Sequence, residues 1–280
     1  GTSGLGGTSG LGGTSGLGGT SGLGGTSGVG GTSAASGLGG TSGATAGKVG
    51  QAGDDGSGGP KFELVTASGW VEATVECPAD KPWVIGTGAR SIGSGGLRSV
   101  VPEPQDSPNP ETVRVAGRAA QMTMAYAVCS DAIGTQILQT SSSNSNSDVF
   151  CGTGMVAIGG GGECTGGGML YRSRPIPDVA GSKPAGWRAT CVSGSVTTYA
   201  VCVTVAEAFS DCHTERASSI GSALVTCPAH HTAVTAGGYC SVHGLLSMEL
   251  NAELTKVNVA CIDATADVNA YSICCGDRPD

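Results

Sequence analysis

Alternating apolar and polar residues run through residues 60–280 of the chain and predict β-strands. The segments TMAYAVC, TTYAVCVTV and TKVNVACI alternate in this way and are rich in Val, Thr and Tyr. The segments PEPQDSPNPE, SSSNSNSD and SRPIPDVAGSKPAG are rich in turn residues and predict loops. No stretch keeps a helical period over a useful length, although VAEAFSDC could form one or two helical turns. We therefore expect a mainly β fold.

The strand pattern occurs three times, at an interval of about 75 residues. Each repeat begins with a strand that enters a cysteine and ends with AYAVC, TYAVC or AYSIC. We assign residues 60–140, 141–210 and 211–280 to three β repeats of sandwich- or prism-like form. Three equivalent repeats could pack around a pseudo-threefold axis or follow one another like beads on a string.

The cysteine spacing predicts how the 12 cysteines pair. Repeats 2 and 3 each carry two inner cysteines, and repeat 1 lacks both, as expected if the inner pair is bonded. Cys212 and Cys275 remain, and they could bond to each other or bridge to another chain. The predicted disulfides are Cys77–Cys129, Cys151–Cys202, Cys164–Cys191, Cys227–Cys274 and Cys240–Cys261.

Residues 1–59 form a Gly-rich arm with too little bulky apolar surface to fold alone. A six-residue period and a three-residue period compete in it. The six-residue period ends at the insertion AAS, whereas glycine keeps recurring at every third position in GKVGQAGDDGSGG. The positions that define these periods are Gly1, Gly4, Leu5, Gly7, Leu11, Leu17, Leu23, Val29, Gly47, Gly50 and Gly53.

A period of three is typical of extended helices of the polyproline II or polyglycine II type, which have no internal hydrogen bonds. The backbone groups of the arm must then bind other chains or water. The partner could be two further copies in a collagen-like trimer, a larger polyglycine bundle, or a groove on a neighbouring β body. The alternative is a flexible Gly/Ser linker.

Composition and charge exclude several classes of protein. The chain has 14 Lys and Arg against 22 Asp and Glu, a net charge of −8, and no basic cluster, so we expect no nucleic-acid partner. It has no apolar run long enough to insert into a membrane. It begins with Gly, from which we expect a processed mature chain. No CxxC pair occurs among the cysteines, which favours disulfides over metal sites. Disulfides in turn indicate an extracellular, secreted or cell-surface location.

Candidate chemistry is sparse. The GGGG stretch at 159–162 lacks the Lys and Ser/Thr of a phosphate loop and predicts a tight turn or a close backbone approach. Histidines adjoin the cysteines at His213, His230 and His231, where we expect surface histidines beside disulfides rather than a zinc cluster. The tryptophans Trp70, Trp83 and Trp187 could stack on sugars, but we expect them to pack in the core or an interface. We expect no enzyme activity, no cofactor and no metal site.

Short motifs resemble a Cys-containing β module of secreted bacterial proteins. They are Cys77, Pro78, Lys81, Gly86 and Gly88 with Tyr126 to Cys129, then Gly159 to Gly162 with Tyr199 to Cys202, then Pro228, Gly237 and Gly238 with Tyr271 to Cys274. Proteins with this module often carry it behind a collagen-like or Gly-rich stalk, and similar layouts occur in phage tail fibres. The resemblance implies an extracellular β head on a stalk and no known chemistry.

Two functions follow as expectations. The first is a structural subunit of an extracellular filament, sheath or stalk, whose arm binds other copies of the chain. The alternative is an adhesin or lectin-like head that binds surface glycans.

Overall fold

The computed structural model describes residues 47–52, 61–105, 109–131, 135–204, 209 and 211–276, and for 47–52 it describes the backbone only. These residues form nineteen strands and their connections, without a helix, so the predicted β fold is confirmed. No helix suited to crossing a membrane occurs in this part of the chain. The arm positions from Gly1 to Val29, and Gly53, lie outside the described residues.

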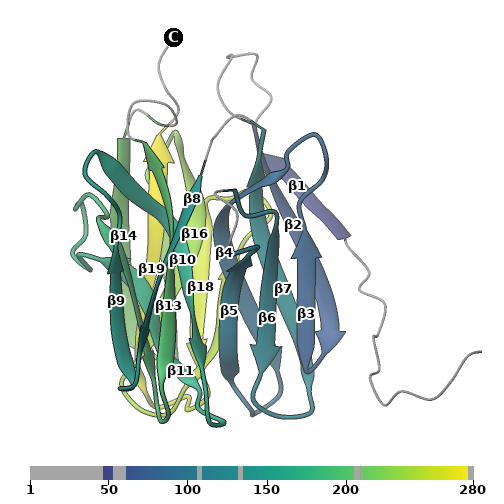
Figure 1. The fold of residues 1–280 in the computed structure, drawn as a ribbon, viewed down its shortest axis with the longest axis vertical. Coiled ribbons are helices and arrows are strands. Elements are labelled where there is room, and N and C mark those ends of the chain that lie inside the picture. The colour runs from purple at the N-terminus through teal and green to yellow at the C-terminus, as the bar shows by residue number, and fades with distance from the viewer. Residues whose placement is uncertain are drawn as a thin grey trace, which may run out of the picture. The chain divides into compact units, whose positions relative to one another are not determined.

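The strands form three sheets, which run along the long axis of the body (Figure 1). Sheet A has the order β1 (Gly47–Ala52), β2 (Phe62–Trp70), β7 (Met122–Ser130), β4 (Trp83–Ile92), β17 (Leu245–Leu250), β18 (Lys256–Cys261), β15 (Ser222–Thr226). Sheet B has the order β3 (Glu72–Glu76), β6 (Thr112–Gly117), β5 (Leu97–Glu103), β10 (Met155–Cys164), β13 (Val196–Thr204), β8 (Gln136–Ser142). Sheet C has the order β14 (Asp211–Ile220), β19 (Asp267–Gly276), β16 (His231–Cys240), β11 (Leu170–Ile176), β12 (Gly186–Cys191), β9 (Asn146–Phe150).

Each sheet is shared by two repeats. Repeat 1 gives β2, β7 and β4 to sheet A and β3, β6 and β5 to sheet B, and the other two repeats divide their six strands in the same way. The repeats join through antiparallel pairs of β5 with β10, β11 with β16, and β17 with β4. These three junctions close a ring, so the repeats pack around a pseudo-threefold axis and are not beads on a string.

The central strands β4, β10 and β16 meet at the middle of this ring. Each has a β-bulge at the same place relative to its partner strand. The Thr87 hydroxyl donates a hydrogen bond to the Gly160 carbonyl at 2.5 Å, and the Thr235 hydroxyl donates one to the Thr87 carbonyl at 3.2 Å. Residues of all three repeats are therefore tied together at the centre.

Glycine allows the central strands to approach each other. A Cβ atom at Gly86 would lie 1.5 Å from the carbonyl oxygen of Val234, and one at Gly159 would lie 2.7 Å from that of Ile85. The GGGG stretch is part of strand β10 and forms no tight turn. Of the two interpretations, the close backbone approach is confirmed.

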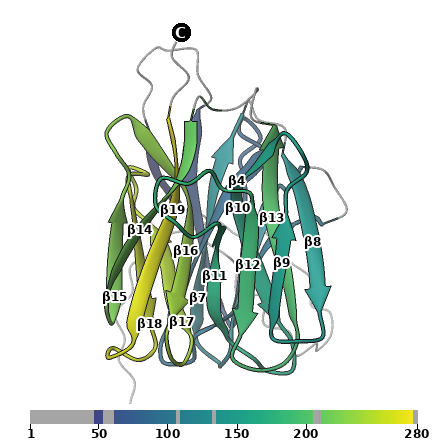
Figure 2. The ribbon, with the colours of Figure 1, turned by 90° about the vertical axis from the view of Figure 1, so that its left-hand side faces the viewer.

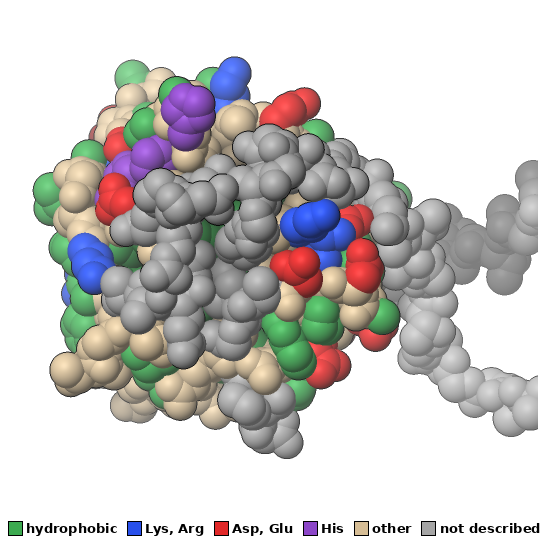
Figure 3. All heavy atoms as spheres, turned by 90° about the horizontal axis from the view of Figure 1, so that it is seen from above, with side chains coloured by type: hydrophobic (Ala, Val, Ile, Leu, Met, Phe, Trp, Pro, Cys, Tyr) green, Lys and Arg blue, Asp and Glu red, His purple; other side chains and the backbone are tan. Residues whose placement is uncertain are grey.

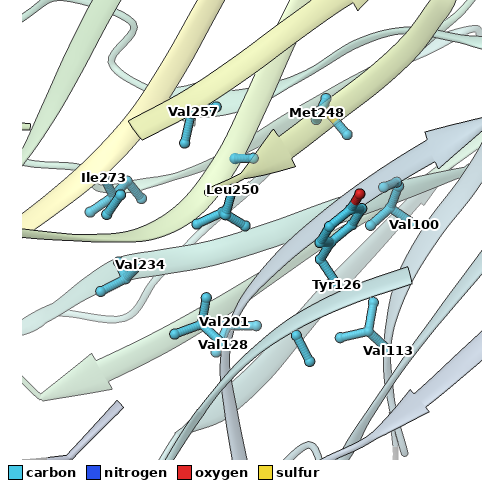
Figure 4. Packing of buried hydrophobic residues seen from close by; sticks show 14 of the residues in the cluster. Val100, Val113, Tyr126, Val128, Val201, Val234, Met248, Leu250, Val257 and Ile273 are labelled. Atoms are coloured by element: carbon cyan, nitrogen blue, oxygen red, sulfur yellow. The ribbon is translucent and has the colours of Figure 1, made fainter. Parts of the chain in front are cut away.

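One buried apolar cluster extends through the body. Figure 4 shows Val128 of repeat 1, Val201 of repeat 2 and Val234 of repeat 3 near one another within it. Burial of apolar surface is the main favourable contribution to folding, so the repeats stabilise each other through a common core.

Six disulfides pair all 12 cysteines, and five of them are the pairs that the sequence predicts. The remaining two, Cys212 and Cys275, bond to each other, as the first of their two alternatives proposes. Cys212 and Cys275 face each other across the paired strands β14 and β19. The Cys77–Cys129 bond instead links the strands that repeat 1 gives to sheet B with those that it gives to sheet A.

The loop predictions are wrong in part. The segment SSSNSNSD contains the end of β8 and the start of β9, so only residues 143–145 lie between strands. These strands form because their backbone groups pair with β13 and β12, which outweighs the weak strand propensity of Ser and Asn. The boundary at 140/141 falls inside β8. Most of VAEAFSDC lies outside the described residues, and Asp211 and Cys212 begin β14.

Candidate functional site

Residues 47–52 of the Gly-rich arm form β1, the edge strand of sheet A. Strand β1 pairs antiparallel with β2, and Gly47 lies opposite Thr66 and Ala52 opposite Phe62. The sequence predicts an extended helix of period three here, but the structure has a strand that includes Gly47 and Gly50. A strand suits this segment because the edge of β2 supplies hydrogen-bond partners that an isolated extended helix lacks.

The outer face of sheet C carries a row of arginine and tyrosine side chains. The antiparallel register sets Arg216 of β14 opposite Tyr271 of β19, and Arg174 of β11 opposite Arg188 of β12. Figure 2 looks onto this sheet, with β14 and β19 on one side and β12 and β9 on the other. Two repeats are needed to build the row, because β9, β11 and β12 belong to repeat 2 and β14, β16 and β19 belong to repeat 3.

The arginines stack on the tyrosines. The guanidinium of Arg172 lies 4.7 Å from the ring centre of Tyr239, and those of Arg174 and Arg216 lie 5.5 Å and 5.7 Å from that of Tyr271. Such contacts are favourable because the negative face of the ring attracts the cation. They also hold the guanidinium groups in fixed orientations, as a binding surface requires.

The loop between β11 and β12 crosses this face. In Figure 2 it passes in front of β16 and β19 to reach β14, where the amide of Gly181 donates to the Thr214 carbonyl at 2.8 Å. Asp178 of this loop forms an ion pair with Arg174. Tyr271 and Arg174 are consequently buried, while Arg172 is half-buried and Arg216 is exposed.

The face has more positive than negative charge. Arg188 pairs with Asp148 and Arg174 with Asp178, but Arg172 and Arg216 have no carboxylate partner among the described residues. The Nε atom of Arg172 is buried there without a hydrogen-bond partner. Burial, together with the charges of the other arginines on the face, lowers the pKa of Arg174. A bound anion would offset this repulsion.

The equivalent tyrosines of the other sheets lie beside carboxylates. The Tyr126 hydroxyl of sheet A donates to Glu249 at 3.1 Å, and the Tyr199 hydroxyl of sheet B donates to Glu163 at 3.4 Å. Burial, and then the carboxylate charge, raises the pKa of Tyr126 well above its usual value and that of Tyr199 to about 12. The three faces are therefore alike in backbone and different in charge.

The tryptophans predicted from the sequence have different surroundings. Trp187 is fully buried, and its indole nitrogen donates to the Ser173 hydroxyl at 3.0 Å, in agreement with a packing role. Trp83 is half-buried at the start of β4, and Trp70 is exposed at the end of β2.

The arginine–tyrosine face was not found from the sequence. Its arginines are scattered over β11, β12 and β14, so no local cluster of basic residues marks them. No protein-family model matches the chain, and no curated protein is significantly similar to it.

Proposed function

We propose that the protein is a structural subunit of an extracellular filament, sheath or stalk. The disulfide-locked body is the building block, and the Gly-rich arm connects it to other copies of the chain. Six disulfides are typical of extracellular proteins, which supports this location.

The observation that carries the proposal is the pairing of β1 with β2. This pairing uses backbone groups of a segment that continues the glycine period of the arm. Backbone pairing depends little on side chains, and exposed strand edges accept added strands from other chains. A repetitive arm can therefore bind a sheet edge of a neighbour in the way that β1 binds β2.

Electron microscopy and light scattering of the full chain and of a variant without residues 1–46 test this proposal. The variant keeps β1, so its body should retain the fold, which circular dichroism and disulfide mapping check. We expect the full chain to form long polymers that resist heat and denaturant, and the variant to remain monomeric. Equal polymerisation of both proteins, or a full chain that stays monomeric, would contradict the proposal.

A second function, an adhesin or lectin-like head for surface glycans, is favoured by the arginine–tyrosine face. Arg172 and Arg216, which the tyrosines hold in place, offer positive charge to an acidic group of a glycan. We expect a glycan array to show retention of sulfated or uronic-acid glycans over neutral ones. The variant Arg172→Gln should lose this retention, whereas Arg118→Gln, which changes an exposed arginine outside the face, should keep it. Equal retention by both variants would exclude this face as the binding site.

A further inference from the structure

One position in the fold is occupied by a different pair of side chains in each repeat. The first member lies opposite the closing cysteine: Glu63 opposite Cys129, Gln136 opposite Cys202, and His213 opposite Cys274. The second member follows the opening cysteine by four residues and is Lys81, Met155 or His231.

In repeat 1 this pair is a buried ion pair. The ammonium group of Lys81 donates to a Glu63 carboxylate oxygen at 3.1 Å, and the two side chains are 8% and 7% exposed. In repeat 2 the pair is uncharged. In repeat 3 both positions hold imidazoles, and Asp211 of the same strand as His213 adds a carboxylate.

The three side chains of repeat 3 converge on one point. An oxygen of Asp211 lies 3.5 Å from Nδ1 of His213 and 3.9 Å from Nε2 of His231, and the ligand atoms of all three lie within 4.8 Å of one another. Figure 3 shows histidines beside acidic side chains at this end of the body. No Lys or Arg forms an ion pair with the three side chains in the described part of the chain, although Lys81 occupies the equivalent place in repeat 1.

The second nitrogen of each imidazole is already engaged. Nδ1 of His231 lies 3.1 Å from the Ala229 carbonyl, and Nε2 of His213 lies 3.2 Å from an oxygen of Glu215. When these oxygens accept the ring hydrogens, the lone pairs on the other two nitrogens face Asp211. A metal-ligating histidine is oriented in this way, because its other nitrogen donates to a carbonyl or a carboxylate.

Strands, not loops, hold the ligands. Asp211 and His213 lie on β14 and His231 on β16, and both strands pair with β19 between them. The disulfide Cys212–Cys275 also links β14 to β19 beside the cluster. The approach of the side chains is thus fixed by the sheet.

We propose that Asp211, His213 and His231 bind a divalent transition-metal ion of the Zn²⁺ type. Two imidazole nitrogens and one carboxylate suit such an ion, which binds them at about 2.0–2.2 Å and leaves a further position for water or another donor. Ligands of one tetrahedral ion lie about 3.4 Å apart at these bond lengths, so only small side-chain rotations are needed. Asp211 is mostly exposed, which gives the ion a path from solvent.

Calorimetric titration of the intact, oxidised full chain with ZnCl₂ tests the site, and Co²⁺ provides a visible absorption signal for the same ligands. We expect one equivalent to bind and the melting temperature to rise with the metal concentration. The variant His213→Glu/His231→Lys installs the ion pair of repeat 1, so it should fold and not bind. Asp211→Asn, a change at an exposed side chain, and Glu215→Gln should each weaken binding by about 10-fold or more.

His243→Gln is the matched control, because this exposed histidine also lies near a carboxylate, with its Nε2 atom 3.5 Å from Asp263. It should leave the affinity unchanged. The absence of stoichiometric binding to the unmodified chain would overturn the proposal. So would unaltered binding by the Asp211 variant, or loss of the site in His243→Gln.

Discussion

At the scale of single residues, the buried pair Glu63–Lys81 shows how one repeat balances charge. Lys81 also contacts Asp80 at 3.3 Å, but the Asp80 side chain is 70% exposed. Glu63 therefore provides most of the stabilisation of the buried Lys81 charge, since a buried ion needs a partner that is itself shielded from water.

We predict that Glu63→Gln lowers the free energy of unfolding by about 3 kcal/mol, the low end for a broken buried pair, because Asp80 still contacts Lys81. Urea unfolding of the oxidised protein measures this loss. The double variant Glu63→Gln/Lys81→Met copies the Gln136 and Met155 pair of repeat 2 and should recover most of it. A double variant as unstable as the single one would contradict the explanation.

Tyr199 gives a prediction for alkaline pH. Its pKa is raised to about 12 from 10.0, so the folded protein keeps the phenol proton where the unfolded chain releases it. The stability that this tyrosine contributes is complete below pH 10 and is lost as the pH rises toward 12. Absorbance at the phenolate band should show one fewer late-ionising tyrosine in Tyr199→Phe than in the unmodified protein, and a Tyr199 that ionises near the ordinary pKa of 10.0 would refute this.

At the scale of elements, the central strands are fixed by backbone contacts that tolerate no side chain. Gly86 in β4 touches the Val234 backbone of β16, so an added methyl group can only be accommodated by moving a strand. The register shift of β4 lies between Val84 and Gly86 and that of β16 between Ala233 and Thr235, so both bulges fall at this contact. The same residues thus determine both how these strands pair and how closely they pack.

We predict that Gly86→Ala destabilises the body by about 3 kcal/mol or more, because the clash is with backbone and not with a flexible side chain. Thermal unfolding measures the effect. Gly152→Ala is the control, because its Cβ atom would make only an ordinary contact of 3.7 Å with the Met155 sulfur. Similar melting temperatures for the two variants would show that the central strands can separate.

At the scale of the whole molecule, the three repeats share sheets, a core and central hydrogen bonds. No repeat can therefore open without breaking the junctions to both of its neighbours. We predict that the oxidised protein unfolds in one cooperative step, with equal calorimetric and van't Hoff enthalpies in scanning calorimetry. Separate transitions for individual repeats would show that the junctions contribute little.

The sequence predicts local features of this architecture and misses those that depend on distant contacts. Alternation in segments such as TTYAVCVTV indicates strands, and the joint absence of inner cysteines from repeat 1 indicates the bonded pairs. The junction of β4 with β17 leaves no such pattern, because it depends on which glycines of one repeat face the backbone of another. The parts of β8 and β9 within SSSNSNSD likewise form only because their backbone groups pair with β13 and β12, which are distant in the sequence.

The candidate sites likewise depend on contacts between residues that are distant in the sequence. Arg172 and Arg216 belong to different repeats and come together only when β11 and β14 enter sheet C. The histidine cluster could have been suspected by aligning the repeats, since His213 and His231 replace Glu63 and Lys81 at matching distances from the cysteines. Its convergence with Asp211 requires the sheet.

A ring of three repeats within one chain also changes how much each substitution lowers the free energy of unfolding. In a ring of three identical chains, a substitution that costs about 1 kcal/mol is present three times and costs about 3 kcal/mol. In this chain it is present once. An ion pair can therefore be replaced by two histidines in one repeat, while the other two repeats keep their original stability.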